Sequence, residues 1–184
     1  MKNRVTPEPP EFPVGPFTPD GVHDNRRREG WIDELQRAPA RLSQLVSGLS
    51  DEQLDTTYRN WTIRQIVHHL ADSHLNMYVR FKLALTEEQP TIKPYDESRW
   101  SLLADARQMD IAPSVQIFSG LHARWIHLLQ SLESNAFERS FYHPANQEVM
   151  PLWRALAYYA WHANHHMTQI EWVRKNKLRL VKGQ

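Results

Sequence analysis

A long helical pattern between residues 62 and 86 leaves few folds open to this chain. Apolar side chains recur there at intervals of three and four residues, as they do along one side of an α-helix, at Ile63, Ile66, Leu70, Met77 and Phe81. Thr62 and Gln65 have the spacing of a capping box, in which two side chains satisfy the backbone groups of a helix start. We therefore predict a helix over 62–86 with one apolar side.

Three other segments show the same spacing. One begins after Asp24, a second begins near Pro113 and runs to about Ser134, and a third begins at Pro151 and runs to about residue 175. The stretches between them predict a capping box at 50–53, a short helical piece near 97–106, and a loop or small hairpin at 137–150. Four long helices without a larger sheet predict an all-α fold of the four-helix bundle type.

The N-terminal region reads differently, because six of the twelve prolines precede residue 20. Proline prevents helix formation, so we expect residues 1–23 to form an extended arm along the bundle. The length of 184 residues suits a single domain over 1–184. No apolar run approaches the length of a membrane span, and the first residues lack the apolar core of a signal peptide, so the expected location is the cytoplasm.

Composition narrows the possible chemistry. The chain has no cysteine, which excludes disulfides, iron–sulfur clusters and a cysteine nucleophile, and leaves histidine and carboxylate as the strong metal ligands. The formal net charge is +1, so no overall positive field attracts nucleic acid. Ten histidines make the distribution of this residue the informative feature.

The last predicted helix carries three histidines in the segment WHANHHM. With about 100° of rotation per residue, His162 and His166 lie together at the edge of the apolar side, whereas His165 turns toward the polar side. Two imidazoles four residues apart can coordinate one zinc-like ion, as in the HExxH helix of zinc proteases. A chain with ten histidines also produces this spacing by chance.

The same rotation applied to the helix over 62–86 separates its histidines. His69 lies at the edge of the apolar side, His68 lies on the outer surface, and His74 falls inside the apolar side, where a core histidine is the favoured interpretation. Asp72 follows His69 by one turn and is a candidate to orient His69 or to act as a base, although an exposed carboxylate on the helix surface is the favoured interpretation.

His69, His162 and His166 therefore form a candidate metal site from two helices. Three histidines leave coordination positions open for water or substrate, which is the arrangement of catalytic rather than structural zinc. The spacing leaves metal binding and ordinary buried or surface histidines open in equal measure. If the face assignment holds, His68→Ala and His165→Ala should leave the metal content near wild type.

Several segments in the same order resemble the YfiT branch of the DinB-like superfamily, which includes metal-dependent hydrolases and bacillithiol transferase A. They are WTIRQIVHHLADSHLNMYVRFKLALTEEQPTIKPYDESRW, LHARW, FYHP and WHANHHM, and the similarity runs from the FPVGPF arm to the last helix. The resemblance implies a four-helix bundle, a homodimer, and one divalent metal ion, zinc or nickel, held by His69, His162 and His166. Asn164 and Gln169 depart from the histidine-rich family pattern, at positions that are not ligands.

The resemblance implies an enzyme that acts on a small molecule, for which two reactions are considered, and a non-enzymatic role is kept as a third interpretation. The first is a hydrolase that attacks a carbonyl-like centre with metal-activated water. The second is an S-transferase that joins bacillithiol or a similar low-molecular-weight thiol to an electrophile through a metal-bound thiolate, with Arg80 and Arg124 as candidates to bind an acidic thiol. The third is a bundle in which the metal has a purely structural role. Balanced charge disfavours binding to nucleic acid.

Overall fold

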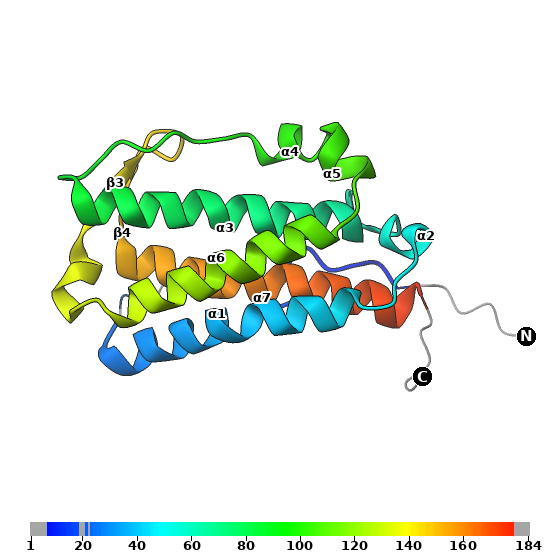
Figure 1. Ribbon diagram of the computed structural model, residues 1–184, viewed down its shortest axis with the longest axis horizontal. Coiled ribbons are helices and arrows are strands. Elements are labelled where there is room, and N and C mark those ends of the chain that lie inside the picture. Colours follow the sequence, from blue (N-terminus) through cyan, green and yellow to red (C-terminus); the bar gives the residue numbers. More distant parts are fainter. Residues whose placement is uncertain (1–6, 19–20, 22, 179–184) are drawn as a thin grey trace, which may run out of the picture.

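The computed structural model describes residues 7–18, 21 and 23–178, and its four long helices lie side by side (Figure 1). They are α1 (Asn25–Val46), α3 (Ile63–Thr86), α6 (Ala112–Gln130) and α7 (Leu152–Asn176). Both α1 and α3 pack against α6 and α7, so each pair shares a common core. The predicted all-α four-helix bundle is confirmed.

Short elements connect these helices. They are α2 (Asp51–Leu54), β1 (Thr57–Tyr58), β2 (Trp61–Thr62), α4 (Glu97–Trp100), α5 (Ala104–Gln108), the 3₁₀ helix η1 (Ser134–Glu138), β3 (Ser140–His143) and β4 (Glu148–Pro151). Strands β3 and β4 form the predicted hairpin before the last helix. The helical piece predicted near 97–106 is two short helices. The ladder of β1 with β2 was not predicted, because strands of two residues have no detectable alternation.

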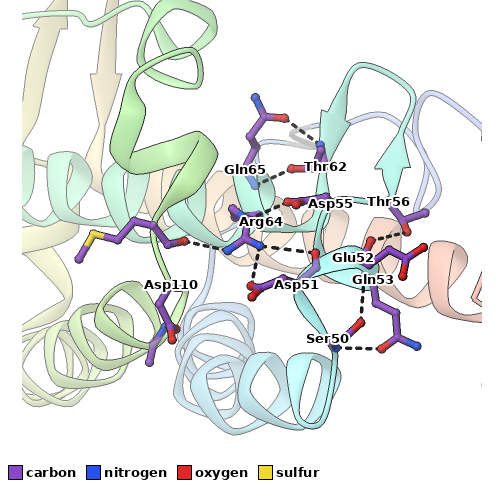
Figure 2. Close-up of polar contacts among 12 residues, drawn as sticks. Ser50, Asp51, Glu52, Gln53, Asp55, Thr56, Thr62, Arg64, Gln65 and Asp110 are labelled. Carbon is purple, nitrogen blue, oxygen red and sulfur yellow. Dashed lines mark hydrogen bonds and ion pairs between the residues drawn. The ribbon is translucent and has the colours of Figure 1, made fainter.

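The start of α3 is fixed by the predicted capping box. The Thr62 side chain accepts a hydrogen bond from the Gln65 backbone, and the Gln65 side chain accepts one from the Thr62 backbone (Figure 2). Ser50 and Gln53 form the same reciprocal pair at the start of α2. Each box satisfies two helical N–H groups that would otherwise lack a partner.

Arg64 then ties this end of α3 to its surroundings. Its guanidinium donates to Asp55 at 2.7 Å, to Asp51 at 2.9 Å, and to the backbone carbonyl of Met109 at 2.9 Å (Figure 2). The Arg64 side chain is buried, and paired charges of this kind are costly to separate. Arg64 therefore joins α2 and the segment after α5 to the turn of α3 that precedes His69.

The core between the four helices is dense and rich in aromatic residues. Its largest fully buried side chains are Trp125, Phe81, Phe118, Phe141, Leu35, Leu42, Ile63, Ile66, Leu70, Met77, Leu129 and Leu152. The apolar residues predicted for the inner sides of α3 and α7 are all buried. This packing gives α3 and α7 rigid mutual positions, and both helices carry the candidate histidines.

The described part of the proline-rich arm lies along α7, as predicted. The Trp161 indole donates a hydrogen bond of 3.0 Å to the Gly15 carbonyl, and the Phe17 ring meets the Tyr158 ring edge-on with centroids 5.2 Å apart. Residues 1–6, 19–20 and 22 of the arm fall outside the described residues. Within the described chain, none of the helices has the length and apolar character needed to cross a bilayer.

Candidate metal centre

His69 from α3 meets His162 and His166 from α7 in the interior of the bundle. One ring nitrogen from each of the three lies within 4.8 Å of the other two, and His69 Nε2 is 3.1 Å from His162 Nε2. The rings of His69 and His166 have centroids 4.7 Å apart, and those of His162 and His166 are 4.5 Å apart. The structure therefore brings the three predicted side chains into one cluster.

The donor set fits a divalent metal ion. Two imidazole nitrogens bound to one tetrahedral zinc at 2.0–2.1 Å are about 3.3 Å apart, close to the observed 3.1 Å. Burial lowers the pKa of His69 to about 4 and holds the pKa values of His162 and His166 well below the usual range, as do the neighbouring histidines. All three imidazoles are therefore neutral near pH 7, as metal ligation requires.

A chain of hydrogen bonds connects His162 to the backbone of α1. His122 Nδ1 lies 2.8 Å from the Leu35 carbonyl oxygen, which can only accept, so this nitrogen carries the hydrogen. Because burial lowers the pKa of His122 to about 4, the ring is neutral and its Nε2 is an acceptor. His74 Nδ1, 3.0 Å away, must therefore be the donor to His122.

The same reasoning passes through His74 to His162. Burial and the neighbouring His122 keep the pKa of His74 well below its ordinary value, so His74 is neutral and its Nε2 accepts. His162 Nδ1 lies 3.4 Å from that nitrogen and donates to it. The remaining His162 nitrogen, Nε2, then presents its lone pair toward His69. The Leu35 carbonyl thus sets the tautomer of His162 through two intervening histidines, which we call the histidine chain.

His166 is oriented by a separate contact on its own helix. His166 Nδ1 donates to the Gln169 side-chain oxygen at 2.8 Å, which leaves Nε2 of His166 free to bind an ion. The Gln169 amide in turn donates to His165 Nε2 at 2.8 Å. Gln169, one of the two departures from the family pattern, therefore serves the site directly. Asn164, the other departure, accepts from Arg41 on α1 at 2.7 Å.

The histidines open into a cavity of about 730 Å³. Trp61 forms part of its wall, with its ring 4.6 Å from the His69 ring and stacked 6.1 Å from the His166 ring, centroid to centroid. Residues from α3, α4, α7 and the β3–β4 hairpin complete the lining. A cavity of this size accommodates a small-molecule ligand.

Of the other three predicted site residues, Arg80, Arg124 and Asp72, only Arg80 lines the cavity. Arg80 is buried and lines the cavity. Arg124 is exposed, lies over the Tyr78 ring at 5.7 Å, and is not part of the cavity lining. Asp72 is half-buried, which raises the pKa of its carboxyl to about 6, with a further contribution from Asp105. Asp72 does not belong to the histidine cluster or to the cavity lining.

The predicted outward orientation of His68 is wrong. Only 5% of this side chain is exposed, and its ring nitrogens contact the Ser114 hydroxyl at 2.7 Å and the Met109 carbonyl at 3.3 Å. The segment around α5 packs on α3 and covers the side that faces away from α7. Rotation around one helix cannot detect a cover that a distant segment provides.

The predicted polar orientation of His165 is also wrong. His165 is 7% exposed, its ring stacks on Trp161 with centroids 4.8 Å apart, and the Phe12 ring lies at 5.9 Å. The proline-rich arm covers this side of α7. His165 lines the cavity without joining the cluster of His69, His162 and His166.

Trp61 and the contact between His74 and His122 were not recognised in the sequence. Trp61 directly precedes the Thr62 cap, but the capping box fixes only the start of the helix and not the direction of the Trp61 side chain. His122 lies in the LHARW segment and faces the core, but no spacing rule relates it to His74 on another helix.

Buried neutral histidines make the stability of the metal-free protein sensitive to acid. The pKa of His122 is about 4 in the folded state and about 6.5 in the unfolded chain, so the unfolded chain binds more protons between these values. We expect the unfolding free energy to fall by about 1 to 2 kcal/mol between pH 6.5 and 5 from His122 alone. Urea unfolding at the two pH values, with chelator present, measures this change. Equal unfolding free energies at pH 6.5 and 5 would contradict a buried, neutral His122.

Comparison with known proteins agrees with the geometry. Residues 34–170 match the family model described as the DinB superfamily. The chain is 47% identical over 161 residues to a protein from Bacillus subtilis named "Putative metal-dependent hydrolase YfiT", covering 86% of this chain and 90% of the relative. A Bacillus licheniformis protein, also named a "Putative metal-dependent hydrolase", is 46% identical over 167 residues, covering 90% and 95%.

A solved structure extends the similarity to three dimensions. The structure of YfiT from Bacillus subtilis, described as "a probable metal-dependent hydrolase with an unusual four-helix bundle topology", superposes with a TM-score of 0.86 at 46% identity. It covers 89% of this chain and 95% of its own. Since the family model, the relatives and the solved structure all span the bundle that carries His69, His162 and His166, this chain belongs to the DinB superfamily as a relative of YfiT.

Proposed function

We propose that this chain is a metal-dependent hydrolase that holds one divalent ion, zinc or nickel, with His69, His162 and His166. The observation that carries the proposal is the convergence of three neutral imidazoles on one point of a cavity of about 730 Å³. The names given to the Bacillus relatives support the same class of reaction. The substrate is a small molecule, because the histidines face a cavity and not an extended surface.

The chain supplies a site that is prepared before any ligand enters. When bound, a divalent ion supplies a Lewis acid that polarises a carbonyl oxygen and lowers the pKa of a water molecule to about 7. The histidine chain and Gln169 hold the rings of His162 and His166 in the tautomers that binding needs. Trp61 and the arm residue Phe12 exclude bulk water from the rings beside them.

The number of ligands favours a catalytic role over a structural one. Among the residues that the structure describes, no aspartate or glutamate joins the three histidines. Structural zinc sites are closed by four protein ligands, whereas three leave room for water and substrate. Asp72 lies outside the cluster, so the proposal assigns it no ligand role. The expected homodimer and cytoplasmic location stay predictions.

The proposal predicts hydrolysis that depends on the metal. Protein loaded with zinc or nickel should turn over members of a panel of esters and amides, and chelator treatment should abolish that turnover, because only the ion supplies the Lewis acid. The measurement is initial rate across the panel for loaded, stripped and reloaded protein. His166→Ala should behave as the stripped protein does.

Two other outcomes would replace the proposal. Metal-dependent conjugation of a small thiol such as bacillithiol to an electrophile, without hydrolysis, would reassign the chain as an S-transferase. If neither reaction depends on metal while chelation sharply lowers the melting temperature, the ion is a structural component and the chain is not a metal-dependent enzyme.

A further inference from the structure

The wall of the cavity contains a buried arginine with no partner. Arg80 is 8% exposed, and within the described part of the chain its guanidinium has neither a hydrogen bond nor an ion pair. Burying an unpaired charge is costly, so natural proteins pair such groups or use them to bind a ligand. Arg80 lines the same cavity as the three histidines, so a ligand in the cavity can reach it.

The other cations of the cavity wall are already engaged. Arg154 is paired with Glu148, and the exposed Arg59 donates to the Pro9 carbonyl at 3.3 Å. Glu97, on α4, also lines the cavity, but it is exposed and forms no ion pair with Arg80 in the described residues. Within the described residues, Arg80 is therefore the buried cation of the wall that has neither a hydrogen bond nor an ion pair.

The position of Arg80 on α3 indicates how far its guanidinium lies from the histidine cluster. Arg80 follows His69 by three turns of helix, and the intervening Ser73 and Met77 line the cavity as well. Eleven residues correspond to a rise of about 16 Å and a rotation of about 20°, so Arg80 and His69 share one side of α3. Both side chains lean toward the N-terminus of α3, and the longer arginine side chain extends further in that direction, so its guanidinium can reach to roughly 10 Å from the histidines.

We propose that Arg80 is an anion-binding subsite, and that the substrate is an elongated molecule with a carboxylate or similar anion roughly 10 Å from the group that reacts at the histidines. The proposed subsite rests on the proposed function, because the reacting end of the substrate is positioned by the metal site. A guanidinium binds a carboxylate through two parallel hydrogen bonds, which sets orientation as well as affinity. The uncharged stripe of Ser73 and Met77 lies between the two ends.

A pair of simple probes tests the subsite by equilibrium binding. Sebacate carries two carboxylates roughly 11 Å apart at about 1.2 Å per bond, and decanoate has the same length with one carboxylate. We expect zinc-loaded protein to bind sebacate roughly 10- to 100-fold more tightly than decanoate, measured by isothermal titration calorimetry. Succinate, which is too short to reach both ends, should show no such gain.

Variants assign the preference to Arg80. Arg80→Gln should remove the preference for sebacate without lowering the melting temperature, because the substitution eliminates an unpaired buried charge. Arg80→Lys keeps the charge without the paired geometry and should retain part of the preference. Arg124→Gln is the matched control, since Arg124 is exposed outside the cavity, and it should bind as wild type does. If Arg80→Gln does not fold, Arg80→Lys and Arg124→Gln decide the assignment.

Equal binding of sebacate and decanoate by the wild type, or a preference that survives in Arg80→Gln, would overturn the subsite. Hydrolysis of the mono-p-nitrophenyl ester of suberate and of its neutral methyl ester separates this failure from that of the proposed function. Metal-dependent turnover of both esters at the same rate, together with equal binding of the two probes, would refute the subsite and leave the hydrolase. Absent turnover with Arg80-dependent binding would refute the hydrolase and leave the subsite.

Discussion

His162→Ala is expected to lose its metal almost completely, with the content falling from about one ion per chain to near zero. His162 contacts both other histidines of the cluster, because its Nε2 lies 3.1 Å from His69 Nε2 and its ring packs against that of His166. Loss of an outer partner of a ligand typically weakens binding 10- to 100-fold, and loss of the ligand itself should exceed that range. Elemental analysis after zinc or nickel loading and gel filtration measures the content.

His165→Ala is the matched control for this experiment. His165 and His162 are each 7% exposed and lie on the same helix, so the two substitutions remove equally buried imidazoles. His165 is outside the metal cluster, and its Nε2 accepts from Gln169, whose own hydrogen bond to His166 does not involve His165. Its variant should therefore keep a metal content near wild type, and the same is expected of His68→Ala. Comparable loss in His165→Ala and His162→Ala would refute the ligand set.

The main helices could be predicted because local chemistry determines them. The capping boxes at Ser50 and Thr62 operate within four residues, and the apolar spacing of α3 and α7 needs no knowledge of the partner helices. The same spacing placed His69, His162 and His166 on inward edges, which is where the structure has them. These features depend on interactions close in sequence.

The features that escaped prediction depend on contacts between distant segments. His68 and His165 were expected to face outward because rotation around one helix assumes that the side away from the core meets solvent. The segment containing Met109 covers His68, and the arm residue Phe12 covers His165, at sequence separations that no periodicity describes. That Arg80 lacks a hydrogen-bond or ion-pair partner likewise depends on the side chains of every surrounding segment that the structure describes.

The second large effect is a loss of zinc affinity on substitution of His74, which belongs to the histidine chain and is not one of the proposed metal ligands. His74→Leu removes the acceptor of the His162 Nδ1 hydrogen and leaves that donor buried without a partner. His162 can then exchange tautomers and place the hydrogen on Nε2, the nitrogen that faces His69. We expect the affinity for zinc to fall roughly 10- to 100-fold, as for other losses of an orienting partner.

A conservative variant separates orientation from packing. His74→Gln can restore an acceptor oxygen near His162 Nδ1 within a side chain of similar reach, so it should bind zinc more tightly than His74→Leu. Competition with a chromophoric chelator measures affinity, and ¹⁵N spectra of histidine-labelled, metal-free protein report the tautomer. The wild type should show His162 with its hydrogen on Nδ1, and His74→Leu should show a mixture of the two tautomers.

The two readouts must change together for the histidine chain to be the cause. Leucine is apolar, and His74 is fully buried among Phe118, Trp125 and Tyr159, so His74→Leu preserves the apolar packing of the core better than alanine would. A lower zinc affinity with an unchanged His162 tautomer would indicate that His74 acts through packing alone. Wild-type affinity in His74→Leu would show that the Leu35 carbonyl, His122 and His74 do not control the metal ligand.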